Sequence, residues 1–307
     1  MGKISVWIRE LRAPFFTCTL VPVLLGTAVA WYYTGSFNLI FFLLALIGIT
    51  AIHAGANMID DYFDYKSGCD TNPIYDELDS PFFGGSRMLA EGKLKPKEVY
   101  IASIIAFAIG SLIGLYFVYS TGWPVLLLGA IGMFFAYFHV THVCKWGLAE
   151  FSLFFNFGPL ITLGAYYVQT QQIAVEPLVA SMPIGLIMAC MLLINQIPDK
   201  KADEVSDKNT VAVTHGEKTA AEVFMNLFFI AFLFIPAAVL LSIMPWCALI
   251  ALLAFPDAKK AMRIAVENYG NPQEITLANA ITYKVHLVTG LLLTSAYLLA
   301  PYCEMLV

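Results

Sequence analysis

The fold is decided by residues 37–64, which read FNLIFFLLALIGITAIHAGANMIDDYFD. Most of this stretch is apolar, and it is long enough to cross the hydrocarbon core of a bilayer, which needs about 20 helical residues. Its last two turns differ, because Asn57, Asp60, Asp61 and Asp64 follow the i, i+3, i+4 and i+7 spacing that places side chains on one helical face. The stretch therefore predicts a transmembrane helix that ends in an acidic stripe.

Similar apolar runs fill the rest of the chain. Of its 307 residues, 59% are hydrophobic and 13% are charged, and the mean hydropathy is +0.74. This charged fraction is about half that of a typical soluble domain. A soluble globular protein is therefore excluded, and we expect an all-α, polytopic membrane protein with one domain over residues 1–307. The apolar runs predict nine spans at about residues 13–33, 37–57, 98–119, 122–142, 148–168, 174–194, 219–242, 245–265 and 280–300.

The basic residues predict how the chain is oriented. All 17 Lys and Arg residues lie before the first span or around alternate connections, and the connections on the other side contain none. By the positive-inside rule, the N-terminus and the long loops are cytoplasmic and the C-terminus lies outside the cell membrane. The net charge of −5 and the lack of a long basic run exclude nucleic acid as a partner. The six cysteines include no CxxC pair, so neither a disulfide framework nor a zinc site is predicted.

A second acidic stripe follows the predicted span at 174–194. Asn195, Asp199 and Asp203 are spaced at i, i+4 and i+8, so they share a face at the same end of the bundle as the first stripe. Clustered carboxylates repel one another and are costly near hydrocarbon, so a cation is needed between them. Hard oxygen ligands select Mg²⁺ or Ca²⁺, and Mg²⁺ commonly bridges one or two carboxylates to phosphate oxygens. The two stripes, with Asp70 beyond the first, predict a metal-bound diphosphate.

Two connecting segments carry groups that suit an oxyanion. Gly84 and Gly85 expose backbone N–H groups, and Ser86 and Arg87 add a hydroxyl and a guanidinium. Lys208, after the second stripe, could supply a further cation to a phosphate.

These motifs resemble those of the UbiA superfamily of intramembrane prenyltransferases over nearly the whole chain. The resemblance implies a diphosphate held by two Mg²⁺ ions between the acidic motifs, a cytoplasmic loop cap, and a prenyl tail in a groove open to lipid. Within the family, four segments look like the branch that prenylates 1,4-dihydroxy-2-naphthoate for menaquinone, which includes the animal vitamin K₂ enzyme. The four segments typical of this branch are 64–70, 147–150, 157–159 and 166–170. The segments that match the family as a whole are Arg12–Pro14, 57–70, 84–87 and 195–210.

The spacing and the resemblance together assign roles to individual residues. The metal-binding set is Asn57, Asp60, Asp61, Asp64, Asp70, Asn195, Asp199 and Asp203, and its leading catalytic members are Asp60, Asp64, Asp199 and Asp203. The diphosphate-binding set is Arg12, Ser86, Arg87 and Lys208. Candidates on the acceptor side are Tyr137, His139 and Lys145. Asp60 stands where the common family motif has Asn, and the last carboxylate of the motif falls at Asp70 rather than at Gly68.

The implied reaction is metal-assisted ionisation of an allylic polyprenyl diphosphate. An apolar cavity and aromatic faces would shield the allylic cation until an electron-rich ring attacks it. The expected acceptor is 1,4-dihydroxy-2-naphthoate, and a glycerol phosphate ether lipid and 4-hydroxybenzoate are the alternatives. A cation transporter is the alternative from another class, but its carboxylates would be expected near the bilayer midplane rather than at one end of the helices.

Overall fold

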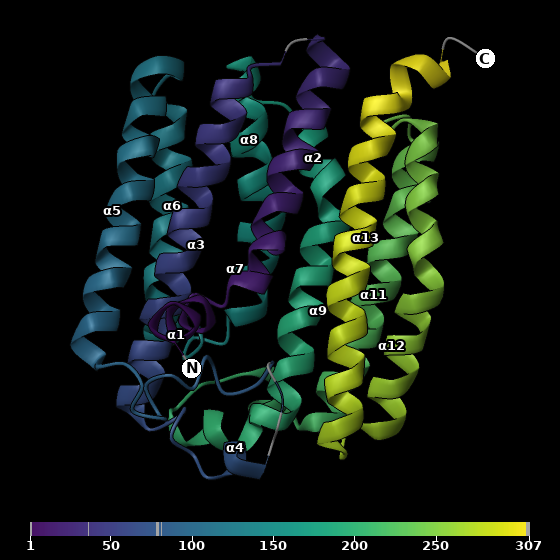
Figure 1. Cartoon of the computed structure of the whole chain (residues 1–307). Helices are drawn as coiled ribbons and strands as arrows, with labels where there is room; N and C mark the ends of the chain where they lie inside the picture. Colours follow the sequence, from purple (N-terminus) through teal and green to yellow (C-terminus); the bar gives the residue numbers. More distant parts are fainter. Residues whose placement is uncertain (1, 36, 78–79, 81, 305–307) are drawn as a thin grey trace.

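The computed structural model describes residues 2–35, 37–77, 80 and 82–304, and this part of the chain is helical and contains no strand. The long helices lie side by side in one bundle (Figure 1). They are α1 (Lys3–Glu10), α2 (Thr17–Thr34), α3 (Leu39–Ser67), α4 (Ile74–Glu77), α5 (Pro96–Thr121), α6 (Pro124–Phe138), α7 (Ala149–Phe155), α8 (Ile161–Thr170), α9 (Glu176–Val205), α10 (Val211–His215), α11 (Glu217–Leu240), α12 (Phe255–Asn268) and α13 (Pro272–Glu304). The shorter helical turns are Ala13–Phe16 and Trp246–Ala254 in 3₁₀ form and His139–Val143 and Asn156–Leu160 in π form.

The described residues contain eight helical segments that are long and apolar enough to cross a membrane. The chain is therefore a multi-pass membrane protein, but the predicted count of nine is not confirmed. The difference lies at 245–265, where a 3₁₀ segment ends at Ala254 and α12 begins at Phe255. Pro256 is compatible with the first turn of a helix but not with its interior, which explains why the helix starts here. The two pieces form one helical run from Trp246 to Asn268, but the charged residues Asp257, Lys259, Lys260 and Arg263 lower its apolar character, and it is not among the eight.

Two helices continue well past their predicted ends. The span at 37–57 becomes α3 (Leu39–Ser67), and the span at 174–194 becomes α9 (Glu176–Val205). α9 remains helical through Pro198. Because both acidic stripes are helical, their carboxylates keep the facing that the sequence spacing predicts.

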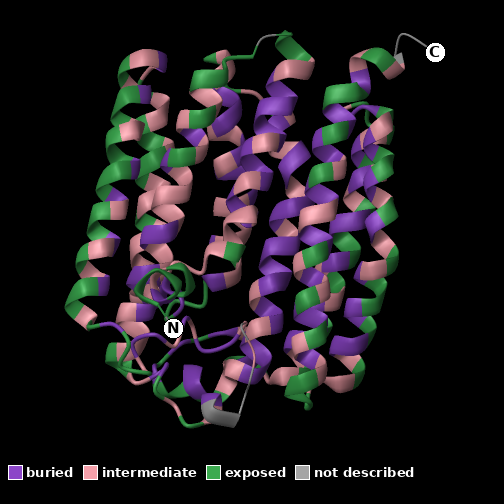
Figure 2. Ribbon diagram, viewed as in Figure 1, coloured by how far each residue is buried: buried purple, intermediate pink, exposed green. Residues whose placement is uncertain are grey.

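The helices divide into a tightly buried half and a looser half (Figure 2). The largest hydrophobic core lies mainly among α2, α9, α11, α12 and α13. On the other side, α5 and α6 carry many exposed apolar side chains, as expected for helices that face lipid. Small residues allow close helix approach, and a Cβ at Gly26 would lie 2.3 Å from the carbonyl oxygen of Thr162.

One end of the bundle is covered by α1, α4 and the described part of residues 68–95, and we call it the capped end (Figure 1). The acidic ends of α3 and α9 lie there. α13 ends at the opposite end of the bundle, away from α1. This arrangement accords with the expected orientation, in which the two termini lie on different sides, but the orientation itself stays a prediction.

Candidate active site

A cavity of about 390 Å³ lies inside the bundle and reaches the capped end. Eleven of the predicted site residues line it, and they come from α3, α9, the turn after α1 and the segments that follow α3, α6 and α9. They are Arg12, Asn57, Asp60, Asp61, Asp64, Asp70, His139, Asn195, Asp199, Asp203 and Lys208. The two acidic stripes therefore face one cavity, because α3 and α9 both extend past their apolar parts in helical form.

Lys208 lies between the two stripes. Its Nζ is 2.9 Å from Asp64 Oδ1 and 3.3 Å from Asp203 Oδ1. Burial alone would lower the pKa of Lys208, but the carboxylates of Asp64 and Asp203 outweigh burial and raise this pKa well above its usual range. Lys208 is thus a buried, permanent cation that holds α3 and α9 together at the capped end.

Other carboxylate oxygens of the stripes have no partner. Asp60 Oδ1 and Asp199 Oδ1 are buried and make no hydrogen bond. Burial, and then the charges of Asp64 and Asp61, raise the pKa of Asp70 well above its usual range. Hard, repelling oxygens without partners are the donor set that a divalent cation such as Mg²⁺ prefers, so the residues present fit a metal.

Cys69 lies among these carboxylates, with its ligand atom within 4.8 Å of those of Asp64 and Asp70. Burial raises the pKa of the Cys69 thiol to about 12, so the thiol stays protonated near neutral pH. A protonated, soft sulfur is a poor ligand for a hard cation. We therefore leave Cys69 out of the metal-binding set.

Arg12 reaches the first stripe from the turn between α1 and α2. Its backbone is left-handed, with a φ of 51°, and its Nη1 lies 3.9 Å from Asp61 Oδ1. Asn57 Nδ2 donates a hydrogen bond of 3.0 Å to the carbonyl of Leu11, which fixes the same turn against α3. The turn therefore brings a guanidinium to the acidic end of the cavity.

The two adjacent glycines lay their backbone directly on the acidic cluster. Gly84 and Gly85 have φ values of 68° and 65°, a conformation that side chains disfavour. A Cβ at Gly85 would lie 2.7 Å from Asp61 Oδ1 and 2.9 Å from Asp70 Oδ2. Only glycine fits this close approach.

Ser86 and Arg87 do not line the cavity. Ser86 N donates to Asp61 Oδ2 at 2.9 Å, and Arg87 Nη1 donates to the carbonyl of Asp70 at 3.2 Å. The Arg87 guanidinium also lies over the ring of Tyr75. Both residues thus hold the cap to the site, and their direct contact with a diphosphate stays a prediction.

Two residues of the site were missed by the sequence analysis. Glu10 is fully buried, and its Oε2 accepts a hydrogen bond of 2.6 Å from Ser86 Oγ. Tyr75 is buried and lines the cavity together with Asp199. Glu10 and Ser86 are 76 residues apart, so no local periodicity could have linked them.

Burial, and then the charge of Asp61, raise the pKa of Glu10 from 4.5 to about 8. Between pH 4.5 and pH 8 the Glu10 carboxyl group is deprotonated in the unfolded chain but stays protonated in the folded chain. The free energy of unfolding therefore falls progressively as the pH rises from about 4.5 to about 8. Glu10→Gln removes this titration. We expect the melting temperature of the variant, relative to the unchanged protein, to be higher at pH 9 than at pH 5, measured without divalent metal. Glu222→Gln, at an exposed residue of α11, is the control. If the melting temperature of Glu10→Gln differs from that of the unchanged protein by the same amount at pH 5 and at pH 9, Glu10 is not a buried acid.

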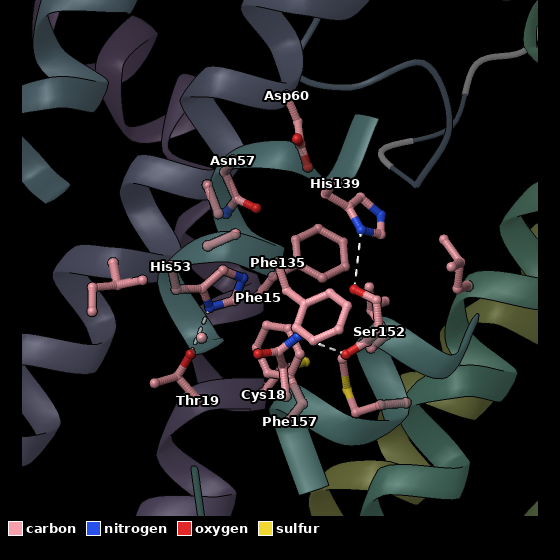
Figure 3. A pocket seen from close by; sticks show the side chains of 18 of the residues that line it. Phe15, Cys18, Thr19, His53, Asn57, Asp60, Phe135, His139, Ser152 and Phe157 are labelled. Atoms are coloured by element: carbon pink, nitrogen blue, oxygen red, sulfur yellow. Dashed lines mark hydrogen bonds between the residues drawn. The ribbon is translucent and has the colours of Figure 1, made fainter. Parts of the chain in front are cut away.

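The three candidates on the acceptor side are separated by the fold. His139 lines the cavity, and its Nδ1 lies 3.3 Å from Ser152 Oγ (Figure 3). Tyr137 packs against Phe63 and Phe107 outside the cavity, because residues two positions apart on a helix lie on nearly opposite faces. Lys145 is exposed and its Nζ lies 3.7 Å from Asp207 Oδ2. Of the three, only His139 is brought to the cavity.

Deeper in the cavity the lining becomes apolar and aromatic. Phe15, Phe135 and Phe157 lie near Asn57 and Asp60 in Figure 3. The ring of His53 contacts that of Phe157 at a centroid distance of 4.9 Å, and its Nδ1 lies 2.6 Å from Thr19 Oγ1. The acidic end of such a cavity can hold a diphosphate through a bound cation. The aromatic faces beside it can stabilise a carbocation next to the diphosphate.

Comparison with known proteins identifies the class to which this fold and site belong. The model of the UbiA prenyltransferase family matches residues 19–272, so the chain belongs to that family and is a prenyltransferase. It is 27% identical to the 1,4-dihydroxy-2-naphthoate octaprenyltransferase of Bacillus subtilis, over 98% of this chain and 94% of that protein. It is 25% identical to the 2-carboxy-1,4-naphthoquinone phytyltransferase of a Synechocystis species, over 95% of this chain and 93% of that protein. The solved structure of a UbiA homologue from Archaeoglobus fulgidus bound to GPP and Mg²⁺ has a similar fold, with a TM-score of 0.60, 13% identity and coverage of 94% of this chain and 99% of that one.

Proposed function

We propose that this prenyltransferase transfers a prenyl group from an allylic diphosphate to 1,4-dihydroxy-2-naphthoate in the formation of menaquinone. One observation carries the proposal: the acidic stripes of α3 and α9 face each other across the end of a cavity whose remainder is apolar. The naphthoate prenyltransferase relatives support the acceptor. The homologue bound to GPP and Mg²⁺ supports the donor and the metal.

Mg²⁺ is the metal that the acidic end would bind. Asp60, Asp64, Asp199 and Asp203 would hold it, since they supply buried oxygens from both stripes. When bound, Mg²⁺ would supply positive charge to the departing diphosphate and so favour cleavage of the allylic carbon–oxygen bond.

The chain's own cations act on the same leaving group. Arg12 and Lys208 line the acidic end, so they add fixed positive charge where the diphosphate gains negative charge. Phe15 and Phe157 lie beside this end and exclude water from the allylic cation. The naphthoate ring carbon, made electron-rich by two hydroxyls, then supplies the electron pair for the new carbon–carbon bond. The ring regains its aromaticity when this carbon releases the group that it carried, a proton or, at the carboxylate-bearing carbon, CO₂.

The acceptor is tested with purified protein in detergent, geranylgeranyl diphosphate and Mg²⁺. We expect a prenylated product from 1,4-dihydroxy-2-naphthoate and none without added divalent metal. 4-Hydroxybenzoate and a glycerol phosphate lipid are offered under the same conditions. If either of these is prenylated while the naphthoate is not, the proposed acceptor is wrong although the chain remains a prenyltransferase.

His139 is proposed to contact the acceptor, because it lines the cavity next to Ser152. Loss of one hydrogen bond is worth about 1 kcal/mol, so His139→Ala is expected to raise the KM of the acceptor about five- to tenfold and to leave that of the diphosphate unchanged. Lys145→Ala is the matched control, since Lys145 is exposed and outside the cavity. If Lys145→Ala raises the KM of the acceptor more than His139→Ala does, the proposal is wrong and Lys145, rather than His139, contacts the acceptor.

The capped end is proposed to face the cytoplasm of a cell membrane, on the basis of the one-sided basic residues. A reporter that is active only in the cytoplasm is expected to be active when fused before Lys3 and inactive when fused after Val307. Activity of both fusions would contradict the odd number of crossings that this orientation requires.

A further inference from the structure

The first helix, α1, runs across the bundle rather than along it. Figure 1 shows α1 end-on, whereas the long helices are seen from the side. The inner face of α1 carries Val6 and Glu10, which are one turn apart and buried. The outer face carries Ile4 and Ile8, also one turn apart, and these side chains are 79% and 51% exposed. α1 therefore turns two large apolar side chains away from the protein.

The exposed surface of α1 is divided into an apolar stripe and a polar stripe. Because a helix has 3.6 residues per turn, Ile4 and Ile8 lie about 40° apart, and we call these two residues the apolar stripe. Ser5 and Arg9, which are also exposed, lie side by side on one flank of it. Trp7 lies on the other flank and is partly buried. Such a division is typical of a helix that lies in the plane of a membrane interface.

α1 lies at the level where α5 enters the hydrocarbon core. Lys95 and Lys97, at the start of α5, are exposed, and exposed isoleucines follow from Ile101 onward. Basic residues directly before a lipid-facing apolar run mark the membrane interface. Val6 of α1 belongs to the same buried cluster as Val99 of α5. The apolar stripe is therefore level with the lipid headgroups beside α5.

Positive charge predominates around α1. Lys3 lines a small depression together with Lys93 and Glu98, and Glu91 pairs with both Arg9 and Lys93. In α1 and residues 91–98 the exposed basic side chains outnumber the exposed carboxylates. The basic residues are Lys3, Arg9, Lys93, Lys95 and Lys97, and the acidic ones are Glu91 and Glu98. This excess favours a membrane surface with anionic headgroups over a zwitterionic one.

The same helix is joined directly to the acidic end of the cavity. Glu10, on its inner face, accepts a hydrogen bond from Ser86 of the cap. Arg12 follows two residues later, with its Nη1 3.9 Å from Asp61 Oδ1. A movement of α1 away from the membrane would therefore carry Arg12 away from the acidic end.

We propose that the apolar stripe of α1 docks into the interface of an anionic phospholipid leaflet, and that this contact keeps Arg12 at the acidic end of the cavity. Ile4 and Ile8 enter the boundary between headgroups and acyl chains, and the basic residues around α1 meet the lipid phosphates. The partner is the bilayer that surrounds the protein. The docking surface lies outside the cavity, so the inference does not depend on the identity of the acceptor.

Docking is measured on the full chain in nanodiscs whose phosphatidylcholine carries bromine on its acyl chains. Bromine quenches tryptophan only at short range, so the quenching that Trp7→Phe removes reports on α1. We expect Trp7 to be quenched in the unchanged protein, and Ile4→Gln combined with Ile8→Gln to remove most of this quenching. Ser5→Gln is the matched control, because it places the same side chain on the polar stripe, and it should keep the quenching. Since all three positions are exposed, both variants should keep their melting temperature.

The effect on the site is measured as binding of geranylgeranyl diphosphate with Mg²⁺, which needs no acceptor. We expect the dissociation constant of the unchanged protein to be at least about threefold lower in nanodiscs that contain phosphatidylglycerol than in those of phosphatidylcholine alone. The variant with both glutamines should bind about three- to tenfold more weakly than the unchanged protein in the anionic nanodiscs, whereas Ser5→Gln should bind as the unchanged protein does.

Three results would overturn the proposal. If Trp7 is quenched no more in the unchanged protein than in the variant with both glutamines, α1 does not enter the interface. If that variant instead turns an oligomer into a smaller species, the apolar stripe is a contact between copies of this chain. If Trp7 is quenched but the diphosphate binds equally in both lipids and in all variants, docking of α1 does not control Arg12.

Discussion

Asp60→Asn and Asp199→Asn are each expected to lower turnover by about a thousandfold or more. Each variant removes a buried carboxylate oxygen that has no partner within the protein and that is proposed to bind Mg²⁺. The loss acts on the bond-breaking step, where removal of one electrostatic group commonly costs 10²–10³ in rate and removal of a metal ligand affects the whole diphosphate. Turnover at saturating donor and acceptor, over a range of Mg²⁺ concentrations, measures the effect.

The same variants should not weaken the fold. Asp60 is buried beside Asp64 and Asp61, and the cost of burial and this repulsion together outweigh the attraction of Lys208 and Arg12. We therefore expect the melting temperature without metal to stay the same or to rise, whereas stabilisation by Mg²⁺ plus diphosphate should disappear. Asp257→Asn, which removes an exposed carboxylate that pairs with Lys284, is the control. Near-normal turnover of Asp60→Asn or Asp199→Asn would remove that residue from the site.

The acidic stripes could be predicted from the sequence because helical spacing alone places their members on one face. Asn57 to Asp64 and Asn195 to Asp203 are each local patterns, and both helices remain regular to Ser67 and Val205. The facing of the two stripes followed from their equivalent positions in the chain. The existence of a cavity between the two stripes could be predicted from the class of fold alone.

The parts that the sequence did not predict depend on long-range contacts or on breaks in helical periodicity. Glu10 meets Ser86 across 76 residues, and Tyr75 reaches the cavity from the short helix α4. The π turn at His139–Val143 interrupts the helical periodicity after α6, so the facing of Lys145 relative to Tyr137 and His139 could not be obtained from spacing. Hydropathy predicted a single span at 245–265, but the backbone geometry of Pro256 favours the first turn of a helix, and α12 begins there.

The helical glycines show a different limit of prediction from sequence. Helical glycines at close contacts, such as Gly26 and Gly110, are indistinguishable in the sequence from Gly114 and Gly164, which face open space. The distinction becomes visible only when the neighbouring helices are in place.

Lys208→Met is expected to reduce turnover by about a hundredfold and also to destabilise the protein. The variant keeps the length of the side chain but removes the cation between Asp64 and Asp203. Breaking a buried ion pair on one side typically costs about 3–5 kcal/mol, because the remaining charges are left buried without a partner. The expected result is therefore a lower melting temperature without metal, in contrast to Asp60→Asn.

Mg²⁺ distinguishes this effect from a simple loss of folding. If Lys208 shares the carboxylates with the metal site, Mg²⁺ should recover more of the melting temperature in Lys208→Met than it adds to the unchanged protein, because the metal then supplies the missing positive charge. Lys145→Met, at an exposed lysine that pairs only with Asp207 among the contacts of the described residues, should show no such recovery. Equal stabilisation of both variants by Mg²⁺ would mean that Lys208 and the metal bind at separate places. Asp64 and Asp203, which Lys208 contacts, would then have to be removed from the metal-binding set.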